Sequence, residues 1–181
     1  MERVLIEHCA ETLVGLKIAN LFSYSYESLE ILHQKIIQLI HVLSKNGIAI
    51  RCLKLGPKRA LIYVYRELEL EERLKETQIR EFLLGFGYHE WTLEEHLNYL
   101  SGRLMKGGEF PHEIGIFLDY PLEDVIGFIE NKGQAYKAKG YWKVYDQESL
   151  TVERFKQFRK CRNILLKRYL SGVSLEQLVR H

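Results

Sequence analysis

The stretch "IAIRCLKLGPKRALIYVYR" (residues 48–66) decides the fold class of this chain. It consists of two runs that are rich in apolar, β-branched and aromatic residues, with Gly56-Pro57 between them. Runs of this composition form strands, and a Gly-Pro pair between two such runs is typical of a turn. The stretch therefore predicts a β-hairpin.

The segments around this hairpin complete an α+β pattern. Residues 15–26 are rich in apolar and aromatic side chains and predict a strand. Residues 27–47 repeat Leu and Ile at helical spacing, which predicts a helix that ends at Asn46-Gly47. Residues 67–87 predict another helix. The order β-α-β-β-α is the beginning of a split βαβ sandwich, so we expect a small antiparallel sheet with helices on one face.

The second half of the chain is expected to be mostly helical. Thr92 and Glu95 have the spacing of a capping box, so a helix should begin there, and Gly107-Gly108 should end it. The elements expected after this helix are two short helices that begin at Pro111 and Pro121, a short strand at 140–145, a long amphipathic helix at 148–172 and one or two further turns at 173–181.

Composition limits the class of protein. With 46% hydrophobic and 28% charged residues, the chain has the balance of a soluble globular protein and suits a single domain, 1–181, with an α+β part (1–87) and a mainly helical part (88–181). No run of about eighteen apolar residues predicts a membrane span, and the N-terminus "MERVLIEHCAETLVG" is unlike a signal peptide. Three widely spaced cysteines without a CxxC pair favour reduced thiols, so we expect a cytoplasmic protein.

Residues 109–133, "EFPHEIGIFLDYPLEDVIGFIENKG", match the spacing of a helix-turn-helix. Ile114 and Leu118 would belong to the first helix of such a pair and Val125 and Phe128 to the second, so that apolar side chains pin the two helices together. The segment therefore predicts a helix-turn-helix-like pair and raises the question of DNA binding.

The charge of this segment argues against a DNA-reading role. Residues 109–131 contain no Lys or Arg. Their acidic residues are Glu109, Glu113, Asp119, Glu123, Asp124 and Glu130. DNA-binding proteins neutralise phosphates with cations, and the whole chain carries a net charge of only +2. We interpret the segment as a scaffold of two packed helices whose acidic face meets water or a basic partner.

Positive charge is concentrated further along the chain, where residues 148–181 hold eight Lys and Arg against three Glu. On a helical wheel, Arg162 falls inside the apolar arc that contains Phe155. A buried guanidinium requires a carboxylate or an anionic ligand. Three interpretations are open for Arg162: an ion pair with an acid such as Glu113 or Asp124, a side chain that extends to water, or an anion-binding site.

Few residues have the spacing of a catalytic or metal site. His8 and Cys9 are adjacent, and neighbours in a helix point about 100° apart, which disfavours a shared metal. His112 follows Pro111 at an expected helix start, where the helix dipole favours a neutral imidazole that can act as ligand or base. The segment "GYHEWTLEEH" (87–96) is rich in His and carboxylates but reproduces no known zinc spacing. Cys9 and His112 are the catalytic candidates.

Tyrosines alternate along two of the expected strands. Tyr24 and Tyr26, like Tyr63 and Tyr65, are two residues apart, so each pair should share one sheet face. Aromatic residues on the strands of a βαββ unit stack bases in RNA-recognition modules. The segment "RALIYVYR" lacks the Gly-aromatic-Gly core of those modules, so core packing is the default interpretation and single-stranded RNA binding an alternative.

The segments "FPHEIGIFLDYPLEDVIGFIENKG" (110–133), "GYWKVY" (140–145) and "KCR" (160–162), together with "CAETLVGLKIANLFSY" (9–24), resemble an uncharacterised bacterial family, domain of unknown function 3793. The resemblance spans nearly the whole chain. It implies a cytoplasmic protein of mainly anaerobic bacteria, and it brings no established activity, cofactor or catalytic residue.

These observations favour a non-catalytic binding or regulatory protein that takes a small anionic ligand or a protein partner. We expect a ligand site where the 111–133 helices, the 140–145 strand and the C-terminal helix converge. Its candidate residues are His112, Tyr141, Trp142, Lys143 and Arg162. One alternative is an enzyme or a metal- or haem-handling protein that uses Cys9, His8 or His112. The other is a protein that binds RNA through the tyrosine face and the basic helix.

Overall fold

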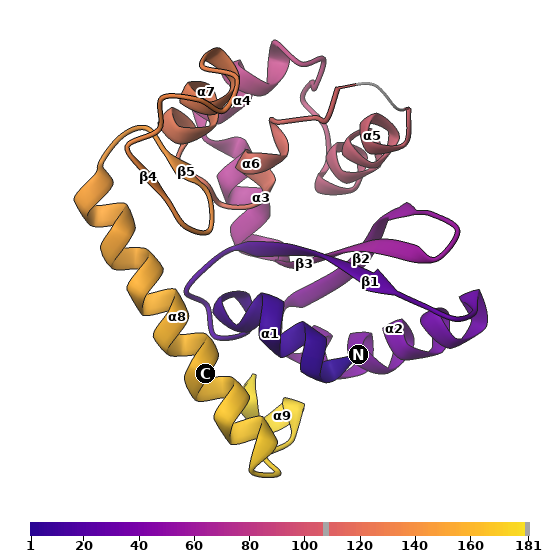
Figure 1. Cartoon of the computed structure of the whole chain (residues 1–181). Helices are drawn as coiled ribbons and strands as arrows, with labels where there is room; N and C mark the ends of the chain where they lie inside the picture. The colour runs from indigo at the N-terminus through magenta and orange to yellow at the C-terminus, as the bar shows by residue number, and fades with distance from the viewer. Residues whose placement is uncertain (107–108, 180–181) are drawn as a thin grey trace.

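In the computed structural model, which describes residues 1–106 and 109–179, a three-stranded sheet lies between helices and a long helix runs along its side (Figure 1). The elements in chain order are α1 (Glu2–Leu13), β1 (Ala19–Ser25), α2 (Leu29–Leu43), the 3-10 turn η1 (Ser44–Asn46), β2 (Ile48–Leu55), β3 (Arg59–Arg66), α3 (Glu67–Lys75), α4 (Thr77–Leu84), α5 (Leu93–Met105), α6 (Ile114–Phe117), α7 (Leu122–Glu130), β4 (Ala138–Lys139), β5 (Lys143–Val144), α8 (Glu148–Leu170) and α9 (Leu175–Leu178). The mixed α+β class expected from the sequence is confirmed.

The sheet has the strand order β1-β3-β2, and both strand pairs are antiparallel. The hairpin predicted from residues 48–66 is present as β2 and β3, with a register shift between Cys52 and Lys54. The central strand β3 is buried along most of its length. A central strand that is apolar at consecutive positions requires cover on both faces of the sheet.

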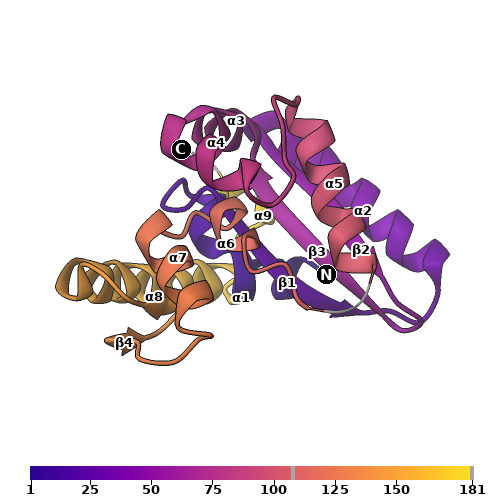
Figure 2. The ribbon, with the colours of Figure 1, turned by 90° about the horizontal axis from the view of Figure 1, so that it is seen from above.

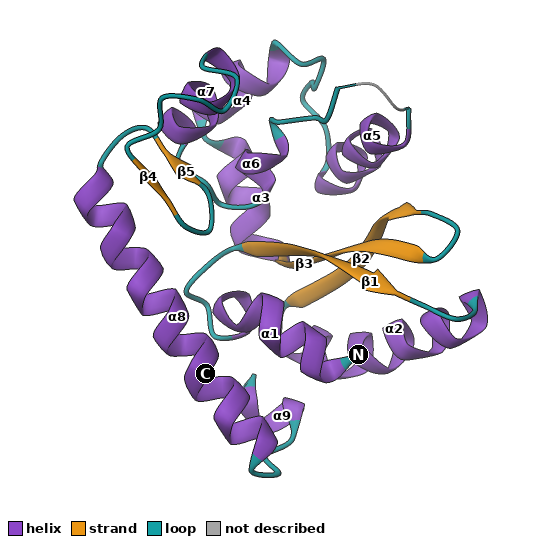
Figure 3. Ribbon diagram, viewed as in Figure 1, coloured by secondary structure: helices purple, strands orange, loops and turns teal. Residues whose placement is uncertain are grey.

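Alternate residues of β3 enter separate hydrophobic cores on the two faces. Ile62 and Val64 pack in a core with residues of α1, α2, α8 and α9. Tyr63 and Tyr65 pack in the other core, with residues of α3 to α7. Figure 3 shows these helix layers on the two sides of the sheet. The prediction of helices on one face was therefore wrong, because α2 and α3 lie on opposite faces.

The alternating tyrosines belong to these cores. Tyr63 and Tyr65 are 0% and 6% exposed, and their rings stack at a centroid distance of 4.9 Å. Tyr24 and Tyr26 pack partly buried against the core on the opposite face. The buried rings of Tyr63 and Tyr65 are not available to stack on bases, and this supports core packing as their role.

The first helix expected after the hairpin differs from the prediction, whereas the start of the next one agrees with it. The helix expected over residues 67–87 is divided into α3 and α4 at Glu76, whose ψ of 131° is extended. The capping box at the start of α5 is confirmed: the Thr92 side chain accepts from the amide of Glu95, and the Glu95 carboxylate accepts from the amide of Thr92. The expected stop at Gly107-Gly108 lies outside the described residues.

The helix-turn-helix-like pair is not confirmed. α6 has four residues, a single turn, and begins at Ile114 instead of Pro111. Pro121 precedes α7 as its N-cap. Two acids of the supposed outer face, Glu113 and Asp124, are buried at 0% and 3% exposure. The expectation of an acidic outer face assumed water on that side of the segment, whereas other parts of the chain cover these two carboxylates.

The long helix α8 connects the two halves of the chain. Its N-terminal half packs Phe155 and Phe158 against Trp142 and Val144, and its C-terminal half packs against α1. Figure 2 shows α7 and β4 beside the N-terminal half of α8. Within residues 1–106 and 109–179, no helix has both the length and the hydropathy that crossing a membrane requires.

Candidate ligand-binding cavity

A cavity of about 300 Å³ lies between α6, α7 and the β4–β5 hairpin, and we call it the aromatic cavity. Four of the five residues predicted for a ligand site line it: His112, Tyr141, Trp142 and Lys143. Its volume is at the lower end of the range for small-molecule sites. The β4–β5 hairpin brings residues 141–143 against α7, which is why segments far apart in sequence meet here.

Trp142 is held in the wall of this cavity by Asp124. The indole Nε1 donates to Asp124 Oδ2 at 2.7 Å, and the amides of Tyr145 and Asp146 donate to Oδ1 at 2.6 and 3.0 Å. The Trp142 ring stacks on Tyr120 at a centroid distance of 4.7 Å and meets Phe155 edge-on at 4.6 Å. A ring with a fixed donor and packed neighbours forms a preorganised wall.

Two glycines allow close packing around the cavity. A Cβ atom at Gly140 would collide with the ring of Phe155, and one at Gly115 would lie 2.7 Å from Val125 Cγ2. Both positions therefore require a residue without a side chain. Because these two glycines have no side chains, the β4–β5 hairpin can pack closely on α8, and α6 can pack closely on α7.

Arg162 lies outside the cavity wall and supports it from behind. Its Nη2 donates to the Tyr141 hydroxyl at 2.8 Å, and this hydroxyl donates to Glu11 Oε1 at 2.9 Å. Burial and the neighbouring Glu11 raise the pKa of Tyr141, so the hydroxyl stays protonated. Of the three interpretations open for Arg162, the ion pair with Glu113 or Asp124 is not formed, because Glu113 pairs with Arg103 and Asp124 accepts from Trp142.

Cations lie against the aromatic rings that line the cavity. The distances to the ring centroids are 5.1 Å for Lys17 and Tyr120, 5.9 Å for Arg154 and Trp142, 5.3 Å for Arg162 and Tyr141, and 5.5 Å for Lys143 and Phe128. Contacts of this geometry are cation–π interactions. Burial lowers the pKa of Lys17 to about 8, which leaves it mostly protonated at neutral pH. Cations therefore lie on several sides of the cavity wall, and two of them have acidic neighbours: Arg154 pairs with Asp119 at 2.7 Å, and Lys17 interacts with Asp119 and Glu11.

Two polar side chains of the wall can meet a ligand. Lys143 Nζ donates to the carbonyl of Gly133 at 2.6 Å and has further donors. The half-buried His112 ring contacts Phe128 at 4.8 Å and Phe110 at 5.7 Å. The carboxylate of Asp124 also lines the cavity, but its oxygens accept from Trp142 and two backbone amides. Its negative charge is thus already compensated by donors.

The other catalytic and metal candidates lie apart from this cavity. Cys9 is fully buried, and burial raises the pKa of its thiol well above the usual value, which disfavours the reactive thiolate. His8 is exposed and stacks on Phe22 at 5.6 Å, on a different side of α1. Across the described residues, no group of three His, Cys, Asp or Glu side chains is placed to hold a metal ion.

The burial of the cysteines predicts their reactivity. Cys52 is half-buried, whereas Cys9 and Cys161 are 0% and 8% exposed. Burial also raises the pKa of Cys161 to about 11. We expect DTNB to modify one thiol of the native protein quickly, and the other two only as the protein unfolds. Peptide mass spectrometry should place the fast modification at Cys52, and a Cys52→Ser variant should lose it. Rapid modification of Cys9 would contradict this placement.

Fold and cavity together define an α+β protein with an aromatic, lysine-bearing cavity between α6, α7 and the β4–β5 hairpin. The chain belongs to the family described as "Protein of unknown function (DUF3793)", whose model matches residues 5–179. This membership confirms the resemblance seen in the sequence and carries no activity with it. No curated protein and no solved structure matches the chain.

Proposed function

We propose that this protein is a non-catalytic, cytoplasmic binding protein whose aromatic cavity takes a small, mainly apolar anion. The observation that supports this proposal most strongly is that four of the five residues predicted for a ligand site line one preformed cavity. Asp124 accepts hydrogen bonds from two backbone amides and from the Trp142 indole, and these bonds hold Trp142 in place. The wall therefore has its shape before a ligand enters.

Charge favours an anion over a cation. Lys139 and Lys143 line the cavity, and neither is in an ion pair among the described residues, whereas Arg154 behind the wall is paired with Asp119. Two lysines at a cavity attract and retain negative charge. The apolar part of such a ligand would pack on aromatic side chains, and its anionic group would take the free donors of Lys143.

The lining favours binding over catalysis. Among the described residues, those that line the cavity include no Ser, Thr or Cys that could act as a nucleophile. His112 is half-buried against Phe110 and Phe128, and no carboxylate of residues 1–106 or 109–179 is bonded to it to orient its ring as in a catalytic triad. An enzyme or a metal- or haem-handling protein that uses His112 is the second candidate, and metal analysis of the purified protein would support it by finding a bound metal.

The aromatic sulfonate 8-anilinonaphthalene-1-sulfonate tests the proposal because it combines two flat apolar rings with one negative charge. We expect it to bind with a fluorescence increase and to quench Trp142 in a Trp91→Phe variant. Lys143→Met removes a charge-assisted hydrogen bond and should raise the dissociation constant about tenfold. Fluorescence titration measures both effects.

Lys137→Met is the matched control. Lys137 is exposed on the same segment and does not line the cavity. Its replacement by methionine changes the net charge by the same amount as Lys143→Met. Leu21→Phe should also weaken binding, because Leu21 lines the cavity and the larger ring fills part of it. Equal dissociation constants for the Lys143→Met and Lys137→Met variants would show that the probe binds elsewhere.

A further inference from the structure

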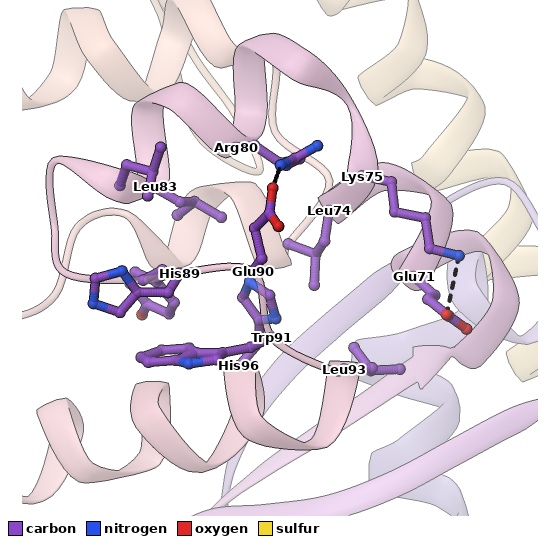
Figure 4. Close-up of a pocket in the computed structure, with 12 residues that line it drawn as sticks. Glu71, Leu74, Lys75, Arg80, Leu83, His89, Glu90, Trp91, Leu93 and His96 are labelled. Atoms are coloured by element: carbon purple, nitrogen blue, oxygen red, sulfur yellow. Dashed lines mark hydrogen bonds and ion pairs between the residues drawn. The ribbon is translucent and has the colours of Figure 1, made fainter.

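A second cavity, of about 450 Å³, lies between α3, α4, the segment 88–93 and the start of α5 (Figure 4). It shares no lining residue with the aromatic cavity. We call it the histidine cavity because His89 and His96 line it. Nothing in the proposed function uses this cavity.

Aromatic rings in mutual contact form one side of the histidine cavity. The Tyr88 ring stacks on His96 at 5.9 Å, and Trp91 meets Tyr88, His89 and His96 at 6.1, 5.2 and 5.8 Å. Figure 4 shows the imidazoles of His89 and His96 on the same side of the Trp91 ring. Leu83 lies across the cavity from these rings. Tyr88 is anchored through its hydroxyl, which donates to Glu113 at 3.2 Å. This side of the cavity is thus aromatic, with Tyr88 and His96 buried and His89 exposed.

The hydrogen bond of His96 determines what the ring offers to a ligand. His96 Nδ1 lies 3.0 Å from the carbonyl oxygen of Thr92. A carbonyl oxygen only accepts, so Nδ1 carries the proton. In the neutral ring, Nε2 then has a free lone pair, and this 7%-exposed side chain lines the cavity. The ring can accept a hydrogen bond from an N–H or amino group of a ligand.

The cations at this cavity are held by exchangeable ion pairs. Arg80 pairs with Glu90, and Figure 4 shows this pair bordering the cavity. The two side chains are 48% and 80% exposed. Exposed pairs of this kind contribute little to stability, so an anionic group can replace Glu90 on Arg80 at small cost. The fork of the guanidinium matches a carboxylate or a phosphate.

We propose that the histidine cavity binds a planar heteroaromatic molecule that carries one anionic group. The ring of the ligand packs among Trp91, His89 and Leu83, and its N–H or amino group donates to His96 Nε2. Its anionic group replaces Glu90 as the ion-pair partner of Arg80. Nucleoside monophosphates and heteroaromatic carboxylates share this chemistry.

The two tryptophans of the chain separate this site from the first one, because Trp91 lines the histidine cavity and Trp142 the aromatic cavity. In a Trp142→Phe variant, we expect saturable quenching of Trp91 by adenosine monophosphate or by 6-aminonicotinate, each of which carries an amino group and an anionic group. Adenosine and 6-aminonicotinamide, which keep the amino group and lack the negative charge, should bind about tenfold more weakly. Calorimetric titration of the unmodified protein with the same compounds avoids any effect of the Trp142 substitution on folding.

Substitutions of the ion pair should change the affinity in opposite directions. Arg80→Gln removes the anion's partner and should raise the dissociation constant about tenfold, whereas Glu90→Gln removes a competing carboxylate and should lower it. A structural role of the pair would make both variants bind less. Binding of 6-aminonicotinate alone assigns a carboxylate ligand, and binding of adenosine monophosphate alone assigns a phosphate. Absence of saturable binding by both compounds, or a Glu90→Gln variant that binds more weakly, overturns the proposal. Either result leaves the proposed function of the aromatic cavity intact.

Discussion

Replacement of Asp124 by alanine is expected to lower the free energy of unfolding by about 4 kcal/mol, since hydrogen bonds to a charged group contribute roughly 1.5–3 kcal/mol each and three donors lose their acceptor. Those donors are the Trp142 indole and the amides of Tyr145 and Asp146. Asp124 is 3% exposed, so water does not easily replace the carboxylate. Urea denaturation measures the loss.

The same substitution should release the wall of the aromatic cavity. Without its acceptor, the Trp142 indole is expected to turn towards water, and its fluorescence emission should shift to longer wavelength. Asp124→Asn keeps one acceptor oxygen and should cost less than Asp124→Ala. Glu123→Ala is the control, because Glu123 is exposed on the same helix and should change stability by only about 0.5 kcal/mol. A loss below about 1 kcal/mol for Asp124→Ala would mean that the hydrogen bonds to Asp124 contribute little.

The sequence predicted those parts of the fold that depend on local patterns. The β2–β3 hairpin follows from two apolar runs around Gly56-Pro57, and the start of α5 follows from the capping box of Thr92 and Glu95. The division of the helix at Glu76 could not be predicted, because both sides of it keep helical composition. The cover on both sheet faces had a signal in the consecutive apolar residues of β3, which the expectation of a one-sided sheet overlooked.

The candidate site was predicted in part because its residues are of unusual type. Residues 141–143 form a short aromatic and basic segment, and His112 lies at the start of the segment on the other side of the same cavity. The partner of Arg162 was missed because Tyr141 lies between it and Glu11, an arrangement that no sequence spacing shows. A signal existed for Asp124, since a buried Trp donor needs an acceptor nearby.

Glu113 illustrates how tertiary structure changes the meaning of an acidic residue. From the sequence, Glu113 was assigned to the acidic outer face of residues 109–131, yet its side chain is buried between the two cavities. Its neighbours His112 and Ile114 line the aromatic cavity, and its partner Tyr88 lines the histidine cavity. The position of this carboxylate therefore affects the walls of both sites.

Arg103→Met is expected to lower the free energy of unfolding by about 3 kcal/mol at neutral pH, because it leaves a buried carboxylate without its cation. Arg103 Nε lies 2.6 Å from Glu113 Oε1, and the Glu113 side chain is 1% exposed. Tyr88 would remain as the donor to Glu113, at 3.2 Å. A single neutral donor does not compensate a buried negative charge. Urea denaturation of the variant beside the unmodified protein measures the difference.

A second substitution distinguishes an unpaired charge from a loss of packing. Adding Glu113→Leu to the Arg103→Met variant removes the buried carboxylate that has lost its cation, and it should recover part of the lost stability. A further loss of stability on adding Glu113→Leu would instead assign the role of Arg103 to the packing of its side-chain stem.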